Sequence, residues 1–342
     1  MKHEPARHRI TTKVWWPWLK RFATAAFFTL VAWLLVTQAR AIEWNEVLAT
    51  LANYPVRTLL VAAALALLSL TLYSSFDLLG RHYTGHTLRA RTVMRVTFIS
   101  YVFNLNMGSL VGGVALRYRL YTRLGLNAGV ITRVMTLSML ANWIGYLLLA
   151  GVIFGFHAPA LPPGWVIGSG GLQVLGFVLL ALALLYLLLC AVLRRRSFVL
   201  WGHELNLPSL RLAALQLGMG AANWLLMGGI VFVLLQQRIA FPTVASVLLV
   251  AAVASVLLVA AVASVIAHVP AGLGVLEAVF IALLSHQLPT HELLAALLAY
   301  RLIYYLAPLT LAAVLYLVAE TRAKKSAPAR RQGSAAADKE LE

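Results

Sequence analysis

Cysteine, charge and long polar stretches are all scarce in this sequence. Only 11% of its 342 residues are charged, and the single cysteine, Cys190, stands in the apolar run LLYLLLCAVL. No disulfide can form within the chain, and we expect Cys190 to pack as a small apolar residue. The longest polar stretches, of about 20 residues, lie at the two ends. A soluble catalytic domain is therefore not expected.

Motifs of common enzymes and metal sites are absent as well. The patterns HExxH, GxxxxGKS and GxSxG do not occur in the sequence. His82 and His86 have i,i+4 spacing, but one face of a helix in a polar loop explains that spacing without a metal. We expect no metal, no cofactor and no catalytic site.

Long apolar runs are what the sequence has in abundance. Hydrophobic residues make up 61% of the chain, and several runs are long enough to cross a bilayer at about 1.5 Å per residue. The pattern predicts an all-α polytopic membrane protein with about six full spans and two re-entrant or broken helical hairpins. The predicted spans are residues 22–38, 58–79, 130–155, 172–193, 211–235 and 293–318.

The net charge of +17 is distributed according to membrane topology. Of the 28 Lys and Arg residues, 24 fall in the polar segments 1–21, 81–95, 117–133, 194–211 and 322–342. The positive-inside rule places these segments and both termini on the cytoplasmic side of a bacterial inner (plasma) membrane. The charge favours anionic lipid headgroups as partners and does not require nucleic acid.

Two segments do not fit simple spans. Residues 96–116 are polar and rich in glycine and have arginines on both sides, which predicts a re-entrant pair of half-helices. In residues 243–287 the stretch HVPAGLG interrupts an apolar run, which predicts a broken hairpin entered from the outside. The nonapeptide SVLLVAAVA at 246–254 is repeated unchanged at 255–263. A full span by residues 243–267, followed by a short return helix, is therefore the alternative.

These segments divide the membrane part into two similar halves. Residues 22–155 contain two spans, a re-entrant segment and a span, and residues 172–318 repeat this order with the re-entrant segment entered from the opposite side. Such an inverted repeat is typical of secondary transporters, whose sites lie near the bilayer midplane where broken helices meet. We expect a basic cytoplasmic segment at 1–21 and a disordered basic cytoplasmic tail at 319–342.

Glu277 is a carboxylate within an apolar run. An ionised carboxylate in hydrocarbon is costly, so such residues usually face a cavity or a partner. We expect Arg301, in LLAYRLIYYLAPL, to be that partner, either in a structural ion pair or in a transport cavity. Pro270, Gly272 and Gly274 explain a helix break before Glu277. The half-helix that follows would aim its N–H groups at an anionic ligand, unless the glycines only allow close helix packing.

The first re-entrant segment carries further candidates. Arg117, Arg119 and Arg123 follow it, and the guanidinium fork suits bidentate contacts to phosphate, although anchoring at the cytoplasmic interface is the alternative. Asn104 and Asn106 lie in an apolar run and must find hydrogen-bond partners.

For four other polar residues we expect structural roles. Asn142 and Asn223 each stand in the tripeptide ANW, and hydrogen bonds between helices explain both. Asp77 and Glu204 are expected at the membrane interface.

Five stretches together resemble a known family. They are YSSFDLLGRHYTGH (73–86), SYVFNLNMGSLVGGVALRYRLYTRLGL (100–126), ANWIGYLLLAGVIF (141–154), HVPAGLGVLEAVFIALL (268–284) and LLAALLAYRLIYYLAPL (293–309). They resemble the membrane region of the lysylphosphatidylglycerol synthase family, in particular its stand-alone inner-membrane branch. The P-x-G-x-G-x-x-E element that ends at Glu277 is the family's most recognisable motif. The first half lacks the proline and acidic residue that many relatives carry there.

The resemblance implies a flippase-like lipid transporter that handles anionic or aminoacylated phospholipids. Lysine transfer is not expected, because the soluble aminoacyltransferase domain is missing here. The candidate substrate-binding residues are Asn104, Asn106, Arg117, Arg119, Gly272, Gly274, Glu277 and Arg301. In the implied mechanism Arg117 or Arg119 holds the lipid phosphate while Glu277 and Arg301 form a polar gate. The alternative is a non-transporting scaffold for a phospholipid-synthesis enzyme.

Overall fold

The computed structural model describes residues 44–159, 168–193, 198–200, 203–205, 208–263 and 274–321. These residues are mainly helical, apart from a small antiparallel hairpin of two strands, β1 (Phe198–Leu200) and β2 (His203–Leu205). The predicted all-α polytopic fold is confirmed.

Five helical segments are long and apolar enough to cross a membrane. They are α3 (Val56–Ser74) with α4 (Phe76–Thr84), α7 (Ala128–His157), α8 (Ser169–Val192), α9 (Leu210–Leu234), and α12 (Thr290–Arg301), which continues through the π-helix η2 (Leu302–Leu306) to residue 321. Each coincides with one of the predicted spans. The remaining predicted span, at 22–38, lies outside the described residues.

A short helix, α2 (Trp44–Ala52), occupies a stretch where the sequence predicts no element. It packs against α12, and the Nδ1 atom of His291 lies 3.0 Å from the Oε2 atom of Glu46. Tyr54, just after α2, donates a hydrogen bond to the carbonyl of Leu234 at 2.7 Å. Burial, with Glu292 close by, raises the pKa of Tyr54 to about 12, so its hydroxyl remains a donor.

The first hairpin consists of α5 (Ala90–Met107), the π-helix η1 (Ser109–Ala115) and α6 (Leu116–Arg123). The chain reverses at Gly108, whose φ of 86° lies in the region that favours glycine. A Cβ atom at Gly112 would lie 2.1 Å from the backbone nitrogen of Asn104, so a glycine is required for this close approach. The reversal predicted within residues 96–116 is confirmed.

The second hairpin consists of α10 (Phe241–Ala263) and α11 (Val275–Leu284), which pack against each other. Pro270 and Gly272 fall between them and lie outside the described residues. The duplicated nonapeptide lies wholly within the 23 residues of α10, whose segment Phe241–Ser255 belongs to the shorter apolar helices and not to the five candidate spans. The 10 residues of α11 are only about 15 Å long, as both predicted topologies of this region require.

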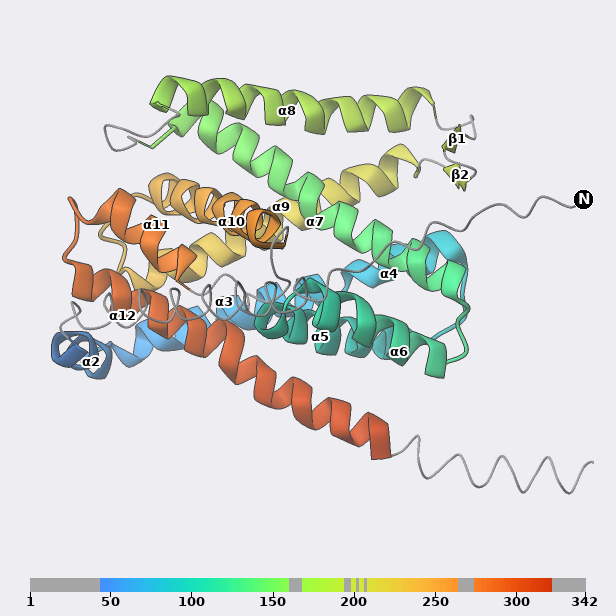
Figure 1. Ribbon diagram of the computed structural model, residues 1–342, viewed down its shortest axis with the longest axis horizontal. Coiled ribbons are helices and arrows are strands. Elements are labelled where there is room, and N and C mark those ends of the chain that lie inside the picture. Colours follow the sequence, from blue (N-terminus) through green and yellow to red (C-terminus); the bar gives the residue numbers. More distant parts are fainter. Residues whose placement is uncertain are drawn as a thin grey trace, which may run out of the picture.

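The two hairpins open toward opposite ends of the molecule (Figure 1). The connection from α6 to α7 lies at the right-hand end, whereas α11 and the start of α12 lie at the left-hand end. This order matches the layout expected of an inverted repeat, and the repeat itself stays a prediction.

The long helices α3, α7 and α9 pack closely against one another, while α8 lies to one side against α7 and α9 (Figure 1). A Cβ atom at Gly220 on α9 would lie 2.1 Å from the carbonyl oxygen of Ala141 on α7. Small residues thus bring these two helices into backbone contact, as is common between membrane helices.

Candidate functional site

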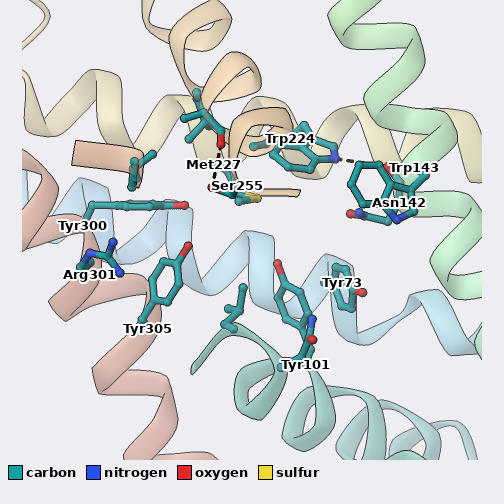
Figure 2. Close-up of a pocket in the computed structure, with 16 residues that line it drawn as sticks. Tyr73, Tyr101, Asn142, Trp143, Trp224, Met227, Ser255, Tyr300, Arg301 and Tyr305 are labelled. Carbon is teal, nitrogen blue, oxygen red and sulfur yellow. Dashed lines mark hydrogen bonds between the residues drawn. The ribbon is translucent and has the colours of Figure 1, made fainter. Parts of the chain in front are cut away.

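A partly enclosed cavity of about 300 Å³ lies among the two hairpins and the long helices (Figure 2). Such a volume is at the lower limit for small-molecule sites. Its described walls come from α3, α5, α7, α9, α10, α11 and the last spanning segment. The aromatic residues of the wall are Tyr73, Tyr101, Trp143, Trp224, Tyr300 and Tyr305. The other polar residues of the wall are Asn104, Asn142, Ser255 and Arg301.

Arg301 lines the cavity and is paired with Glu277. Its Nε atom donates to Oε1 of Glu277 at 2.5 Å, and its Nη2 atom donates to Oε2 at 2.9 Å. The backbone N–H of Gly274, at the start of α11, donates to the same Oε2 atom at 3.1 Å. The predicted partnership of Glu277 and Arg301 is confirmed, and it joins the helix break to the last spanning segment.

Gly274 is the one residue of the predicted P-x-G-x-G break whose position is described. It precedes α11 with a φ of 87°, in the left-handed region that favours glycine. This conformation turns the chain into the half-helix and places its N–H beside Glu277.

A hydrogen-bond network supports the aromatic wall from behind. The hydroxyl of Ser69 on α3 donates to Oδ1 of Asn223 on α9 at 2.8 Å, and lies 2.9 Å from the hydroxyl of Tyr304. The Tyr304 hydroxyl is in turn 3.1 Å from that of Tyr101 on α5. The hydrogen bond between helices predicted for Asn223 is confirmed, and the network fixes Tyr101 at the cavity.

Three further asparagines differ in their surroundings. Asn106 donates to the carbonyls of Val102 at 2.9 Å and Tyr305 at 3.3 Å, so its amide has partners in the protein, as predicted. Asn142 is joined to α9 through its backbone carbonyl, which accepts from Nε1 of Trp224 at 3.3 Å. Asn104 and Asn142 line the cavity, and their side-chain amides make no hydrogen bond to another described residue. The partners predicted for these two amides are therefore not found among the described residues.

Arg117 is buried away from the cavity, with 2% of its side chain exposed. Its Nη2 atom lies 3.5 Å from Oδ1 of Asp77, and the hydroxyl of Tyr121 donates to Oδ2 at 2.8 Å. Asp77 is fully buried within the protein, and its expected place at the membrane interface stays a prediction. Arg117 supplies an opposite charge and Tyr121, one turn further on α6, supplies a hydrogen bond, while Oδ1 of Asp77 makes no hydrogen bond within the described residues.

Arg119 and Arg123 do not contact Asp77 but pair with Glu320. Arg119 lies 3.2 Å from Glu320, and Nη1 of Arg123 lies 2.5 Å from the same carboxylate. These contacts join α6 to the end of the last spanning segment. The phosphate-binding role expected for Arg117 and Arg119 stays a prediction, and the structure gives both guanidinium groups a carboxylate partner.

The aromatic wall is the part of the site that the sequence analysis missed. Signals for it are visible in hindsight, because a tryptophan follows the asparagine of both ANW tripeptides and three tyrosines flank Arg301 in YRLIYY. Among the described residues no group of three or more His, Cys, Asp or Glu side chains is placed to hold a metal ion.

The helices and the cavity define a multi-pass membrane protein with an aromatic and polar site inside its helical bundle. The family described as "Lysylphosphatidylglycerol synthase TM region" matches residues 21–312, and the chain belongs to it. It is 43% identical over 311 residues to "Inner membrane protein YbhN" of Escherichia coli (strain K12), covering 91% of this chain and 95% of that protein. It is 30% identical over 301 residues to "Uncharacterized protein slr0712" of Synechocystis sp., covering 86% and 90%.

These comparisons confirm the resemblance to the stand-alone, YbhN-like branch of the family. Together with the apolar helices they make the chain a multi-pass inner membrane protein.

Proposed function

We propose that the chain moves phospholipids between the two leaflets of the inner membrane, with the headgroup passing through the aromatic cavity and the acyl tails remaining in lipid. The observation that carries this proposal is a cavity with aromatic and polar residues in its wall, between two hairpins that open toward opposite ends of the molecule. Sites of secondary transporters occupy this position, where broken helices meet. In the proposed orientation both termini are cytoplasmic, as the distribution of Lys and Arg favours.

Arg301 is the residue proposed to bind the phosphate that all phospholipids share. A guanidinium has five N–H donors, and the pair with Glu277 uses two of them. Three donors therefore remain that no other described residue occupies. A phosphate can approach these donors without breaking the ion pair, and charge-assisted bonds of this kind are stronger than neutral ones.

Glu277 is proposed to keep Arg301 in place and to act with it as a polar gate. An unpaired arginine inside a membrane protein is costly, so Glu277 stabilises it while the cavity is empty. Rocking of one half against the other would expose the cavity to each leaflet in turn.

Leaflet exchange of a fluorescent anionic phospholipid in proteoliposomes tests the proposal. Labelled lipid on the outer leaflet is quenched by dithionite, and the unquenched pool reports exchange. We expect the wild type to exchange lipid much faster than protein-free vesicles, and Glu277→Ala to lose most of this rate. Because the substitution can weaken folding, both proteins are first checked for a monodisperse elution profile.

Two results would contradict the proposal. If the folded wild type exchanges none of a panel of labelled anionic, zwitterionic and aminoacylated phospholipids, the chain does not move lipid, and a scaffold for a phospholipid-synthesis enzyme becomes the better account. If folded Glu277→Ala exchanges lipid at the wild-type rate, the gate does not include Glu277.

A further inference from the structure

We propose that the last spanning segment is hinged at η2 and Pro308, and that Asn106 is the positioning residue that holds this hinge against the first hairpin. The inference goes beyond the proposed function, because it names the joint at which one hairpin moves relative to the other. It rests on the proposed function only for the use of this motion in transport.

Pro308 explains why the helix changes its turn here. A proline has no N–H to donate to the carbonyl one turn earlier, and its ring crowds that carbonyl. Just before Pro308 the chain widens into η2, in which the N–H of Ala307 donates to the carbonyl of Leu302, five residues earlier. Membrane helices tolerate a proline through such local π turns and through partners on neighbouring helices. The hydrogen-bond ladder is therefore incomplete at this point, where helices commonly bend.

Asn106 supplies the partner from a neighbouring helix. It is the penultimate residue of α5 and stands just before the reversal at Gly108. Its Nδ2 atom donates to the carbonyl of Val102 on its own helix at 2.9 Å and to the carbonyl of Tyr305 in η2 at 3.3 Å. One amide thus joins the tip of the first hairpin to the wide turn.

The two halves of the last spanning segment are attached to different hairpins. Before η2, Arg301 is paired with Glu277 on α11, in the second hairpin. After η2, Glu320 is paired with Arg119 and Arg123 on α6, in the first hairpin. Figure 1 shows the segment running from α11 toward the end of the molecule at which α6 lies. A hinge between these attachments would let each half move with its own hairpin.

The hinge stands at the wall of the cavity. Arg301 immediately precedes η2 and Tyr305 belongs to it, and Figure 2 shows both on the same segment beside the cavity. A bend at η2 would change the distance between these side chains and the helices across the cavity. Hinges consist of a few positions that absorb the change in backbone angles, and π turns are frequent at functional sites.

Distances between spin labels test the hinge. Cys190 is the single cysteine of the chain, so Cys190→Ser gives a background for labelled cysteines. Thr321→Cys labels the exposed end of the last spanning segment, and Leu210→Cys labels the exposed start of α9. In lipid nanodiscs, double electron–electron resonance should give a broad or two-peaked distance distribution for this pair. Leu210→Cys with Ala128→Cys, at the start of α7, does not cross the hinge and should give one narrow distance.

Pro308→Ala separates a hinge from a fixed kink. The substitution supplies the missing N–H and removes the crowding ring, so the segment should become stiffer and the protein should still fold. We expect the distance distribution to narrow and lipid exchange in proteoliposomes to slow several-fold. A fixed kink predicts that the stiffer protein keeps the wild-type exchange rate. Pro55→Ala is the matched control, because Pro55 is exposed at the start of α3 and lies outside the hinge; it should change neither quantity.

Variants of Asn106 test the positioning role without touching the proline. Asn106→Leu removes the donor to the carbonyl of Tyr305, so the distance distribution should broaden further. Asn106→Gln retains an amide and should restore the wild-type distribution. Asn53→Leu makes the same change as Asn106→Leu at an exposed position and should leave the distribution unchanged. Identical distributions for Asn106→Leu and the wild type would overturn the role of Asn106.

A single narrow distance in the wild type would overturn the hinge, and so would an unchanged distribution in folded Pro308→Ala. Where the wild type exchanges lipid, an undiminished rate in folded Pro308→Ala would overturn it as well. These outcomes are distinguishable from failure of the proposed function. A wild type with a broad distribution that exchanges no lipid would contradict transport and leave the hinge standing. A wild type that exchanges lipid with a narrow distance would leave transport standing without this hinge.

Discussion

Both carboxylate oxygens of Glu277 accept hydrogen bonds from the guanidinium of Arg301, at 2.5 and 2.9 Å. The two residues stand 24 positions apart in the sequence, one in the first turn of the half-helix α11 and the other at the end of α12. The pair holds a charged group at the wall of the cavity and keeps both charges compensated.

Removal of either partner should lower the stability of the protein, and removal of both should lower it by less than the sum of the two single losses. Glu277→Ala leaves Arg301, which is 14% exposed, without its partner, and Arg301→Ala does the same to Glu277, which is 18% exposed. Each variant should lose up to about 3 kcal/mol of stability. The double variant leaves no unpaired charge, so its loss should be smaller than the sum of the two single losses. Thermal unfolding in detergent, followed by tryptophan fluorescence, measures these differences; strictly additive losses would show that the pair is not coupled.

Removing one partner of the buried Asp77–Arg117 pair should cost much more stability than breaking the exposed pairs of Glu320. Asp77 and Arg117 are 0% and 2% exposed, so Asp77→Ala would leave a buried arginine unpaired at a cost of about 3–5 kcal/mol. Arg119 and Arg123 are 49% and 37% exposed, so Glu320→Ala should cost about 1 kcal/mol or less.

Denaturant titration of the two variants checks this contrast. Similar losses for Asp77→Ala and Glu320→Ala would contradict the structural role given to the buried pair.

Removal of the hydroxyl group should affect the stability of the protein differently at Tyr300 and at Tyr304. The Tyr300 hydroxyl has no described partner, so Tyr300→Phe should leave the unfolding midpoint unchanged or raise it slightly. The Tyr304 hydroxyl lies within hydrogen-bond distance of Ser69 and Tyr101, so Tyr304→Phe should lower stability by about 1–3 kcal/mol. Equal midpoints for the two variants would argue against the network behind the wall.

Two glycines of α9, Gly218 and Gly220, allow a controlled test of the packing between α7 and α9, because only one of them faces α7. A Cβ atom at Gly220 would lie 2.1 Å from the carbonyl oxygen of Ala141, whereas nothing lies within 4 Å of one at Gly218. Gly220→Ala should therefore cost about 1–3 kcal/mol, and Gly218→Ala should stabilise the helix by about 0.5–1 kcal/mol. Thermal unfolding of the two purified variants checks the signs, and a neutral Gly220→Ala would contradict the close approach.

The sequence predicts the spanning helices well because their signal is strong. A run of about 20 apolar residues has few alternatives to a membrane helix, and basic residues mark its ends. The reversal at Gly108 follows from glycines and amides that a lipid-facing helix would avoid. The helix α2 was missed because its 9 residues are too few to span a membrane, although Trp44, Val47, Leu48 and Leu51 follow the i, i+3, i+4, i+7 spacing of an amphipathic helix.

The sequence predicts only part of the site, because the position of the other residues depends on how the helices pack. Glu277 and Arg301 are conspicuous because charge inside an apolar run requires a partner. Asp77, by contrast, looks like an ordinary residue at the end of a span, and only the packing of α6 reveals that it is buried with Arg117. Aromatic residues are common in membrane helices, so which of them face a cavity depends on helix rotation, which the sequence pattern does not specify.

Blocking the cavity is the most direct test of the account. Ala252 lines the cavity, and Ala252→Trp would fill much of it, whereas Leu182→Trp places the same side chain on the exposed surface of α8. In proteoliposomes we expect Leu182→Trp to exchange labelled phosphatidylglycerol at close to the wild-type rate and folded Ala252→Trp to exchange it no faster than protein-free vesicles. Exchange at the wild-type rate by Ala252→Trp would show that lipid does not pass through this cavity.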